Sequence, residues 1–547
     1  MNRMGVCVAI ALPASLAWAA DRIPPDVRDH VTRRVDQGYC VGLVVGVLDE
    51  QGPSYFSRGR FSVNGGRPVA EDTLFEIGSI TKAFTAILLA DMAERGQVDL
   101  NDPVQKLLPA SARVPARGES QITLRDLATH RSGLPRLPDN LEPKDSENPY
   151  ADYDEEHLLQ FLSGHELSRD IGKQYEYSNL GAGLLGHALA RSARTTYERL
   201  IIDRVCDPLG MSDTRILLSD EQKSRLAQGH AGTKPVKNWD LDALAGAGAL
   251  RSTAQDMLRF LSGNLGLAET PIAKALQATH RDRFETGQPD LYVALGWHVW
   301  TKFGTTILWH NGGTGGYRSF CGFCPEKKLG VVVLTNSFED IDDIGLHILG
   351  PKFELKTLRE PTTVDAASLT DYVGHYELRP GLVFEITSEG NQLFAQLTGQ
   401  DKHPVYPESD RKFFFKVVDA QLSFVRGDDG KIDHLILHQN GDHKARRLID
   451  YKPPVRTEVP LDPAALQKYV GKYELAPGVQ FDVTLADGQL KVKLTGQPAF
   501  PVYPESETKF FYKVVEAQIT FVKDESGAVA SLILHQGGRD QTAKRIP

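Results

Sequence analysis

The pattern of hydrophobic positions divides the chain into a first part that mixes strands with helices and a second part built from short strands. Apolar and β-branched runs bounded by turn residues predict strands in the first part at residues 41–47, 54–61, 305–309, 317–324 and 330–335. Apolar residues at helical spacing predict helices at residues 27–35, 83–92, 181–194 and 253–262. This order predicts an α+β domain over residues 20–357, in which the first and last strands meet in one antiparallel sheet with helices around it.

The second part is a tandem duplication. Tyr372-Val373-Gly374 recurs at residues 469–471, and Leu435-Ile436-Leu437-His438-Gln439 recurs at residues 532–536, in both cases 97 residues later. We place the copies at residues 364–450 and 461–547 and expect them to match without an insertion or deletion. Each copy alternates short β-rich runs with turns, which predicts a small antiparallel β-barrel or a sandwich.

The N-terminus has the pattern of a secretory signal peptide. Arg3 precedes an apolar run from Met4 to Ala17, and Ala17-Trp18-Ala19 is a small-x-small cleavage site, so we assign residues 1–19 to the signal. Pro13 interrupts the run, and a retained anchor would need about 20 apolar residues. We therefore expect a periplasmic or secreted protein with no integral membrane span after signal cleavage.

Composition excludes several classes of function. The chain has 547 residues, 41% of them hydrophobic and 24% charged, which is ordinary for a soluble protein of two to four domains. The net charge is −9 and no basic block stands out, so nucleic acid is not an expected partner. Cys321 and Cys324 lie on a predicted strand, where residues three apart point to opposite faces, so we expect neither a metal site nor a redox pair.

A first chemical candidate lies at Ser79 and Lys82. Phe84, Ile87 and Leu88 recur at helical spacing just after them, which places Ser79 near the start of a helix. Residues three apart share a helix face, so the lysine amine can reach the serine hydroxyl. A serine becomes a nucleophile when a neighbouring base takes its proton, and a lysine whose pKa is lowered can be that base. A capping serine followed by an exposed lysine fits the spacing equally well.

Two further stretches carry groups suited to the same chemistry. Tyr177 could relay protons if a nearby cation favoured its phenolate form, and Asn179 could hydrogen-bond a substrate amide. The stretch from His310 through Gly312 and Gly313 follows a β-rich run, and its glycines would let a substrate backbone approach closely. The Gly313 and Ser79 N–H groups could then form an oxyanion hole. The alternatives without a catalytic role are a buried tyrosine beside a helix cap for Tyr177 and a glycine-rich turn for the stretch from His310 to Gly313.

Ser-x-x-Lys, Tyr-x-Asn and His-x-Gly, in this order, resemble the three motifs of the penicillin-recognising serine hydrolases. The match looks like the class C β-lactamase branch, which includes D-aminopeptidases, D,D-carboxypeptidases and esterases, and it covers about residues 25–340. Flanking phrases that share the resemblance lie at residues 123–127, 208–211 and 330–336.

The resemblance implies a role for each matching residue. Ser79 is then the acylated nucleophile, and Lys82 and Tyr177 share proton transfer. The residues that hold the substrate are then Asn179, His310, Gly312 and Gly313. The family uses no metal or organic cofactor in this reaction, so none is expected here.

One departure from the family pattern bears on the substrate. Typical class C β-lactamases carry Lys-Thr-Gly as the third motif, whereas this chain has His310-Asn311-Gly312. A usually neutral imidazole replaces a permanent cation, which disfavours strong β-lactamase activity. Because the trailing β domains resemble those of D-aminopeptidases, we expect an exported peptidase that acts on short or linear peptides, including D- or other non-standard residues. A carboxylesterase, a weak β-lactamase and a non-catalytic ligand-binding protein are the alternatives, and the oligomeric state stays open.

Overall fold

The computed structural model describes residues 22–452, 456–486, 488–495, 497, 499–537 and 539–546. The predicted signal peptide at residues 1–19 therefore lies outside the described residues. Within them, no helix combines the length and the apolar character that a membrane crossing requires.

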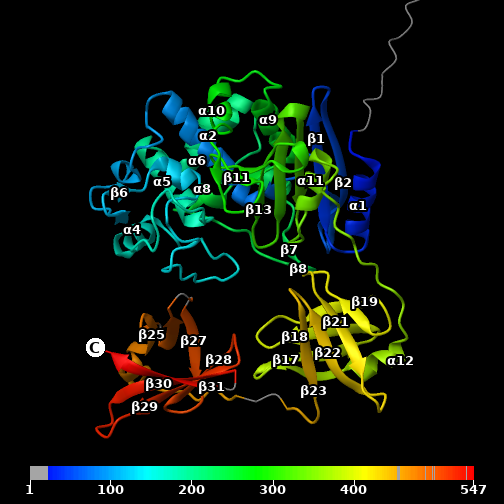
Figure 1. The fold of residues 1–547 in the computed structure, drawn as a ribbon, viewed down its shortest axis with the longest axis vertical. Coiled ribbons are helices and arrows are strands. Elements are labelled where there is room, and N and C mark those ends of the chain that lie inside the picture. The colour runs from blue at the N-terminus through cyan, green and yellow to red at the C-terminus, as the bar shows by residue number, and fades with distance from the viewer. Residues whose placement is uncertain are drawn as a thin grey trace, which may run out of the picture.

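A nine-stranded antiparallel sheet forms the frame of the first part, in the order β10-β11-β12-β13-β14-β15-β1-β2-β3 (Figure 1). Its strands are β1 (Gly42–Asp49), β2 (Gly52–Ser62), β3 (Gly65–Pro68), β10 (Phe284–Glu285), β11 (Leu291–Val293), β12 (His298–Trp300), β13 (Ile307–Gly313), β14 (Arg318–Cys324) and β15 (Leu329–Thr335). Leu43 pairs with Thr335, so the first and last long strands do meet in one sheet, as predicted. The strand expected at residues 305–309 instead runs to Gly313, because its glycines continue the ladder with β14.

Helices cover both faces of this sheet. Helices α1 (Pro25–Asp36) and α11 (Asp342–Leu349) pack on one face, where Val331 and Val333 point. Val332 and Leu334 point to the other face, as alternation along a strand requires. The helices of the rest of this domain are α2 (Thr81–Glu94), α3 (Leu124–Ala128), α4 (Glu155–Gly164), α5 (Asn179–Ser192), α6 (Tyr197–Ile201), α7 (Asp220–Ser224), α8 (Ala245–Gly248), α9 (Ala254–Leu265) and α10 (Ala273–Ala278).

Three short two-stranded sheets complete the domain, and the two cysteines of the Cys-x-x-Cys pair lie on opposite faces of the large sheet. The strand pairs are β4 (Phe75–Glu76) with β9 (Arg251–Ser252), β5 (Ala116–Arg117) with β6 (Ser120–Gln121), and β7 (His230–Ala231) with β8 (Lys234–Pro235). Cys321 belongs to the hydrophobic cluster on one face of the sheet and Cys324 to the cluster on the other. The expectation that their side chains point apart is confirmed.

Each copy of the duplicated part forms a closed eight-stranded antiparallel barrel, which decides between the barrel and the sandwich. Barrel 1 consists of β16 (Gly374–Arg379), β17 (Leu382–Glu389), β18 (Gln392–Leu397), β19 (His403–Pro407), β20 (Lys412–Phe414), β21 (Gln421–Arg426), β22 (Ile432–His438) and β23 (Asp442–Leu448). Barrel 2 consists of β24 (Gly471–Ala476), β25 (Val479–Ala486), β26 (Gln489–Leu494), β27 (Ala499–Pro504), β28 (Lys509–Tyr512), β29 (Ala517–Lys523), β30 (Val529–Gln536) and β31 (Arg539–Ile546). A short helix precedes each barrel, α12 (Ala366–Leu369) and α13 (Pro463–Leu466).

The last hairpin of each barrel corrects the expectation of an uninterrupted repeat. His438 pairs with Asp442 in barrel 1, whereas the matching His535 pairs with Asp540 in barrel 2. The final strand of the second copy is therefore displaced by one extra residue. The insertion falls in a turn, where an added residue costs little.

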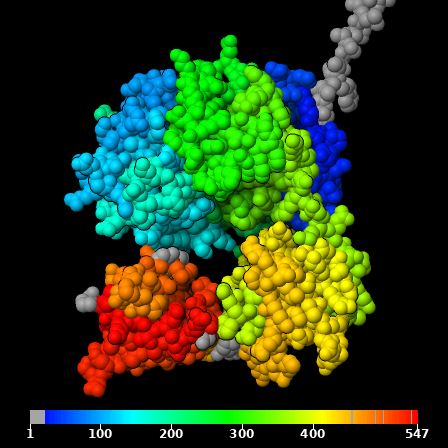
Figure 2. Space-filling model, in the orientation of Figure 1, coloured from blue at the N-terminus to red at the C-terminus, as the bar shows by residue number. Residues whose placement is uncertain are grey.

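Both barrels lie on the same side of the hydrolase-like domain (Figures 1 and 2). Barrel 1 contacts it through Lys416, whose Nζ donates to the Gln37 carbonyl at 2.5 Å. Barrel 2 contacts it through Lys493, whose Nζ donates to the Asp139 carbonyl at 2.8 Å. Each barrel thus touches a different segment of the first domain.

Candidate active site

The turn that carries Ser79 lies against the end of strand β13 in the large sheet. A single 3-10 turn, Gly78–Ile80, leads directly into α2. Gly78 has φ +48°, and a Cβ there would lie 2.8 Å from the Gly313 nitrogen, so only a glycine fits. Gly312 precedes Gly313 on strand β13, and a Cβ on Gly312 would lie 2.0 Å from the Ile77 carbonyl oxygen. The two glycines let the turn and the strand touch through their backbones.

Ser79 and Lys82 are in direct contact. The Lys82 Nζ donates to the Ser79 Oγ at 2.8 Å and to the Ala247 carbonyl at 2.7 Å. Burial lowers the pKa of Lys82 well below its ordinary value, and the positive charge of Arg136 lowers it further. The site therefore favours the neutral amine, which is the form that can accept a proton.

Tyr177 stands beside this pair, just before α5. Ser178 caps that helix by accepting a hydrogen bond from the Gly181 N–H at 2.8 Å. The Lys82 Nζ lies 4.9 Å from the centroid of the Tyr177 ring. Burial raises the pKa of Tyr177 above its ordinary value, although a hydrogen bond with Ser79 opposes this shift. Desolvation outweighs the charge of Arg136 and keeps the phenol protonated, so the condition for a phenolate, that a nearby cation favours it, is not met.

Three imidazoles, two of them buried and that of His298 partly buried, surround the Tyr177 ring. Ring centroids lie 4.5 Å away for His130, 6.2 Å for His298 and 6.1 Å for His310. Burial lowers the pKa of all three, and Lys82 adds to the effect. They are neutral near pH 7, so the third motif supplies no cation. No motif in the sequence pointed to His130 or His298.

The stretch from His310 to Gly313 is the end of strand β13, so the alternative of a glycine-rich turn is wrong. Ser319 on β14 fixes the nucleophile turn to this strand, because its Oγ donates to the Ile77 carbonyl at 2.8 Å. Among the described residues, the buried His310 Nε2 has no hydrogen-bond partner. The structure thus brings all three motifs to one place.

A small hollow opens onto the Ser79 side chain. Its volume is about 30 Å³. The residues that line it are Gly78, Ser79, Tyr150, Asn179, Trp239, Leu241, Leu244, Ala247, Gly248, Gly313 and Thr314. Gly78, Ser79 and Gly313 all reach this hollow, so it lies where the nucleophile turn meets the end of β13.

Tyr150 and Trp239 form a wall of this hollow that the sequence did not indicate. Their ring centroids are 5.3 Å apart in an edge-to-face arrangement. The backbone N–H of Trp239 donates to Glu76 Oε1 at 3.1 Å, and Arg251 donates to the Trp239 carbonyl at 3.1 Å. Glu76 and Arg251 themselves form a buried ion pair at 3.2 Å, so the wall is held firmly.

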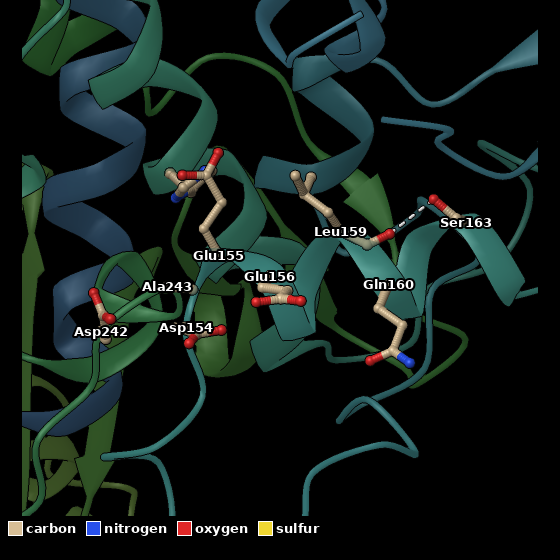
Figure 3. Close-up of a pocket in the computed structure, with 9 residues that line it drawn as sticks. Asp154, Glu155, Glu156, Leu159, Gln160, Ser163, Asp242 and Ala243 are labelled. Carbon is tan, nitrogen blue, oxygen red and sulfur yellow. Dashed lines mark hydrogen bonds and ion pairs between the residues drawn. The ribbon is translucent and has the colours of Figure 1, made fainter. Parts of the chain in front are cut away.

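A much larger hollow lies elsewhere and contains none of the motif residues. It has a volume of about 780 Å³ and is lined by acidic residues at the start of α4 (Figure 3). Asp154 caps that helix, and Glu155 and Glu156 occupy its first turn. Negative charge at a helix N-terminus is favoured by the helix dipole, so the acidic cluster has a structural explanation.

Comparison with known proteins places the first domain. A family model described as "Beta-lactamase" matches residues 27–347, which is more than half of the chain. The chain belongs to the β-lactamase family. A second model, described as a domain of unknown function (DUF3471), matches residues 358–450 and 455–545, which contain the two barrels.

Characterised relatives of this β-lactamase-family chain include peptidases. The D-alanyl-D-alanine-carboxypeptidase/endopeptidase AmpH of Escherichia coli K12 is 31% identical over 64% of this chain and 98% of the relative. A "Beta-lactamase" of the same strain is 28% identical over 61% of this chain and 95% of its own length. The crystal structure of D-alanine carboxypeptidase AmpC from Burkholderia cenocepacia superposes with a TM-score of 0.51 at 28% identity, covering 60% of this chain and 99% of that one. The family and these relatives identify the chain as a serine hydrolase.

Proposed function

We propose that the protein is an exported hydrolase that forms an acyl-enzyme on Ser79 and cleaves amide bonds in short or linear peptides, including peptides with D- or other non-standard residues. The observation that carries the proposal is the 2.8 Å contact between the Ser79 Oγ and the buried Lys82 amine. A neutral amine at this distance can take the serine proton as the oxygen attacks.

The reaction would proceed in two halves. In the first, Ser79 attacks the amide carbonyl while Lys82 accepts its proton, and the Ser79 and Gly313 N–H groups stabilise the oxyanion. The protonated Tyr177 then donates to the leaving amine and recovers a proton from Lys82. In the second half, water attacks the acyl-enzyme by the reverse of these proton transfers, which releases the acid and restores Ser79.

The third motif offers the substrate no permanent cation. His310 is buried and neutral, so it lacks the permanent charge that would hold a β-lactam or terminal carboxylate. Two of the relatives described above carry carboxypeptidase names, which favours a peptide over an ester.

A substrate panel tests the proposal directly. The purified protein and its Ser79→Ala variant would be compared on D-amino-acid amides, D-Ala-D-Ala peptides, linear peptides, nitrophenyl esters and a chromogenic cephalosporin. We expect Ser79-dependent cleavage of at least one peptide or amide class. Hydrolysis confined to the esters or the cephalosporin would overturn the peptidase assignment.

A substitution in the third motif tests the substrate argument. His310→Lys restores the cation found in typical class C β-lactamases, so kcat/KM should rise for substrates that end in a carboxylate relative to their amidated forms. An unchanged ratio would show that His310 does not set this preference.

The mass of the protein recovered from the cell envelope or medium tests export, with loss of residues 1–19 as the expected result.

A further inference from the structure

A second cavity lies at the junction of the hydrolase domain and barrel 1. Its volume is about 640 Å³, within the range of small-molecule sites. The hydrolase domain contributes Tyr39, the β7–β8 hairpin and residues 337–339, and the barrel contributes its upper end (Figures 1 and 2). It shares no lining residue with the hollow beside Ser79, so it is a separate site.

The barrel side of this cavity is an apolar floor. Phe384, Ala395 and Leu437 line it, and all three are buried and point into the barrel. Phe415 and Leu397 extend the same surface. A closed eight-stranded barrel is just wide enough to be filled by its own side chains or to hold one small ligand at its mouth. The floor can therefore receive an apolar chain or ring.

Lys416 is a partly buried cation that lines this cavity and has no counter-ion among the described residues. The Lys416 Nζ lies 3.7 Å from the centroid of the Tyr406 ring and donates to the Gln37 carbonyl. No carboxylate of the described residues forms an ion pair with it. Burial lowers the pKa of Lys416, so the charge is held at a cost. An ammonium has three N–H donors, and one of these is used by Gln37, which leaves donors for an anion.

Barrel 2 shows what the same lysine does when its charge is neutralised internally. Lys513 occupies the matching position, 3.5 Å from the centroid of the Tyr503 ring. It pairs with Glu458 at 2.9 Å. The residue that matches Glu458 in barrel 1 is Pro361, which carries no charge. The duplication therefore kept the lysine in both copies, and only the copy beside the cavity lacks its acidic partner.

Other differences between the copies fall on the same cavity wall. Lys402 and His403 in barrel 1 match Ala499 and Phe500 in barrel 2, and the small Ala395 matches the larger Val492. Barrel 1 is thus more basic at the rim and roomier at the floor.

The remaining charges around the cavity are mostly neutralised by protein partners. Lys234 pairs with Glu147 at 3.1 Å, Lys402 with Glu389 at 2.6 Å, and Glu339 with Lys356 at 3.0 Å. Asp401 is exposed at the rim. Lys416 is therefore the group best placed to meet an incoming anion.

We propose that this cavity binds a small amphiphile that carries a carboxylate, with its apolar part on the barrel floor and its carboxylate against Lys416. A fatty acid and the C-terminus of an N-acylated peptide share this chemistry. The site is independent of the peptidase reaction, so its failure would leave the proposed function untouched.

Calorimetric titration of the full chain with decanoate tests the proposal. We expect a single site, about tenfold or more weakened by Lys416→Gln because a charge-assisted hydrogen bond is lost. Lys513→Gln removes the matching lysine of barrel 2 and should leave decanoate affinity unchanged, and Lys416→Arg should retain binding. Thermal unfolding of each variant checks that the fold is intact.

Tail-matched ligands complete the test. Decyltrimethylammonium has the same tail with the opposite charge and should bind at least about tenfold more weakly than decanoate, by the same loss of a charge-assisted contact. N-octanoyl-Gly-Gly against decanoate distinguishes a peptide terminus from a free acid, and tighter binding of either supports the class. Absence of decanoate and N-acyl peptide binding would overturn the proposal, as would equal weakening by Lys513→Gln or equal binding of the cationic amphiphile.

Discussion

The hydrolase domain and the barrels treat buried polar groups in opposite ways. The Ser79 region buries Lys82, His130 and His310 within one cluster. Among the described residues of the two barrels, the buried side chains with polar groups are Gln421 and tyrosines such as Tyr376 and Tyr473, whose hydroxyls donate to backbone carbonyls. The barrel interiors are otherwise apolar and aromatic. The contrast separates a region whose buried groups are poised for chemistry from two regions built for stable packing, because buried ionisable groups shift pKa while buried apolar groups only stabilise.

The largest expected effect is the loss of turnover when the nucleophile of the hydrolase domain is removed. Ser79→Ala should abolish turnover while the fold stays intact, because members of a catalytic unit each cost orders of magnitude when removed. Hydrolysis of a nitrophenyl ester and of the best peptide would measure the loss, and circular dichroism would check the fold. A variant that keeps more than about a tenth of the wild-type rate would contradict the assignment of Ser79.

Replacing a core aromatic residue of a barrel should have the opposite effect: it should lower the stability of the barrel and leave turnover unchanged. Phe521 is buried and lies 4.4 Å from Tyr469 between ring centroids, so Phe521→Ala should destabilise barrel 2 by about 3–5 kcal/mol. Turnover of a small ester per folded molecule should not change. Hydrogen exchange resolved by segment would measure the stability of the barrel.

The matching change in barrel 1 is the control for that experiment. Phe424 packs on Tyr372 with ring centroids 4.6 Å apart, so Phe424→Ala should loosen barrel 1 and spare barrel 2. If either change reduced ester turnover in proportion to the lost stability, the barrels would be part of the catalytic fold and the comparison would fail.

The two proton-transfer residues give a further test of the assigned chemistry in the hydrolase domain. Lys82→Ala and Tyr177→Phe should each lower turnover by roughly 100-fold or more, because each removes a general acid–base group. Their double variant should lose much less than the product of the two losses, since the residues act as a unit. Fully multiplicative losses would instead show that the two groups act independently.

Removing the barrels should have a milder effect on the chemistry. Truncation after residue 357 should leave a folded domain that hydrolyses a small ester, but its preference among peptides should change severalfold. The reason is that Lys493 of barrel 2 holds the Asp139 carbonyl, in the segment that brings Tyr150 to the wall beside Ser79. The ratio of kcat/KM values for a peptide series would measure the change.

A point variant distinguishes this contact from a general effect of the barrels. Lys493→Ala in the full chain should reproduce part of the altered peptide preference, and Lys491→Ala on the same strand should not. An unchanged preference after truncation would leave the barrels as stabilising or anchoring modules.

The rate should also depend on pH. The reaction needs neutral Lys82, whose pKa is lowered by burial, and protonated Tyr177, whose pKa is raised. As the pH falls through the lowered pKa, Lys82 gains a proton and kcat/KM should fall by at most about tenfold per pH unit. An acid limb that persists in the residual activity of Lys82→Ala would contradict this role for Lys82.

The barrels could be predicted from sequence further than the site could. Strand alternation and the repeated motifs such as Leu435–Gln439 predicted two small β domains, because each barrel depends on contacts between neighbouring strands. Closure into a barrel came only from the pairing of first and last strands, which alternation does not encode. The extra residue before β31 escaped notice because it changes a turn and no strand pattern.

In the hydrolase domain, the sequence motifs identified residues of the candidate site but gave neither their burial nor the residues that surround them. Ser79, Asn179 and Gly313 line one hollow, as their motifs led us to expect. The protonation state of Tyr177 could not be predicted from the sequence, because burial, which decides its pKa, depends on chain segments far away. Tyr150 and Trp239 lie in irregular segments with no periodic signal, so only the folded structure could show that they form a wall.

The pairing of β1 with β15 has a consequence for how the chain acquires its structure. Leu43 and Thr335 are partners, so the centre of the sheet cannot form until nearly the whole hydrolase domain is present. Each barrel closes within a much shorter stretch of chain, from β16 to β23 or from β24 to β31. Because long-range pairing slows folding, the domain made first should finish late, and the edge of the apolar strand β1 that faces β15 should stay unpaired until then, although β1 can already pair with β2. That strand is then the segment most exposed to aggregation while the protein matures.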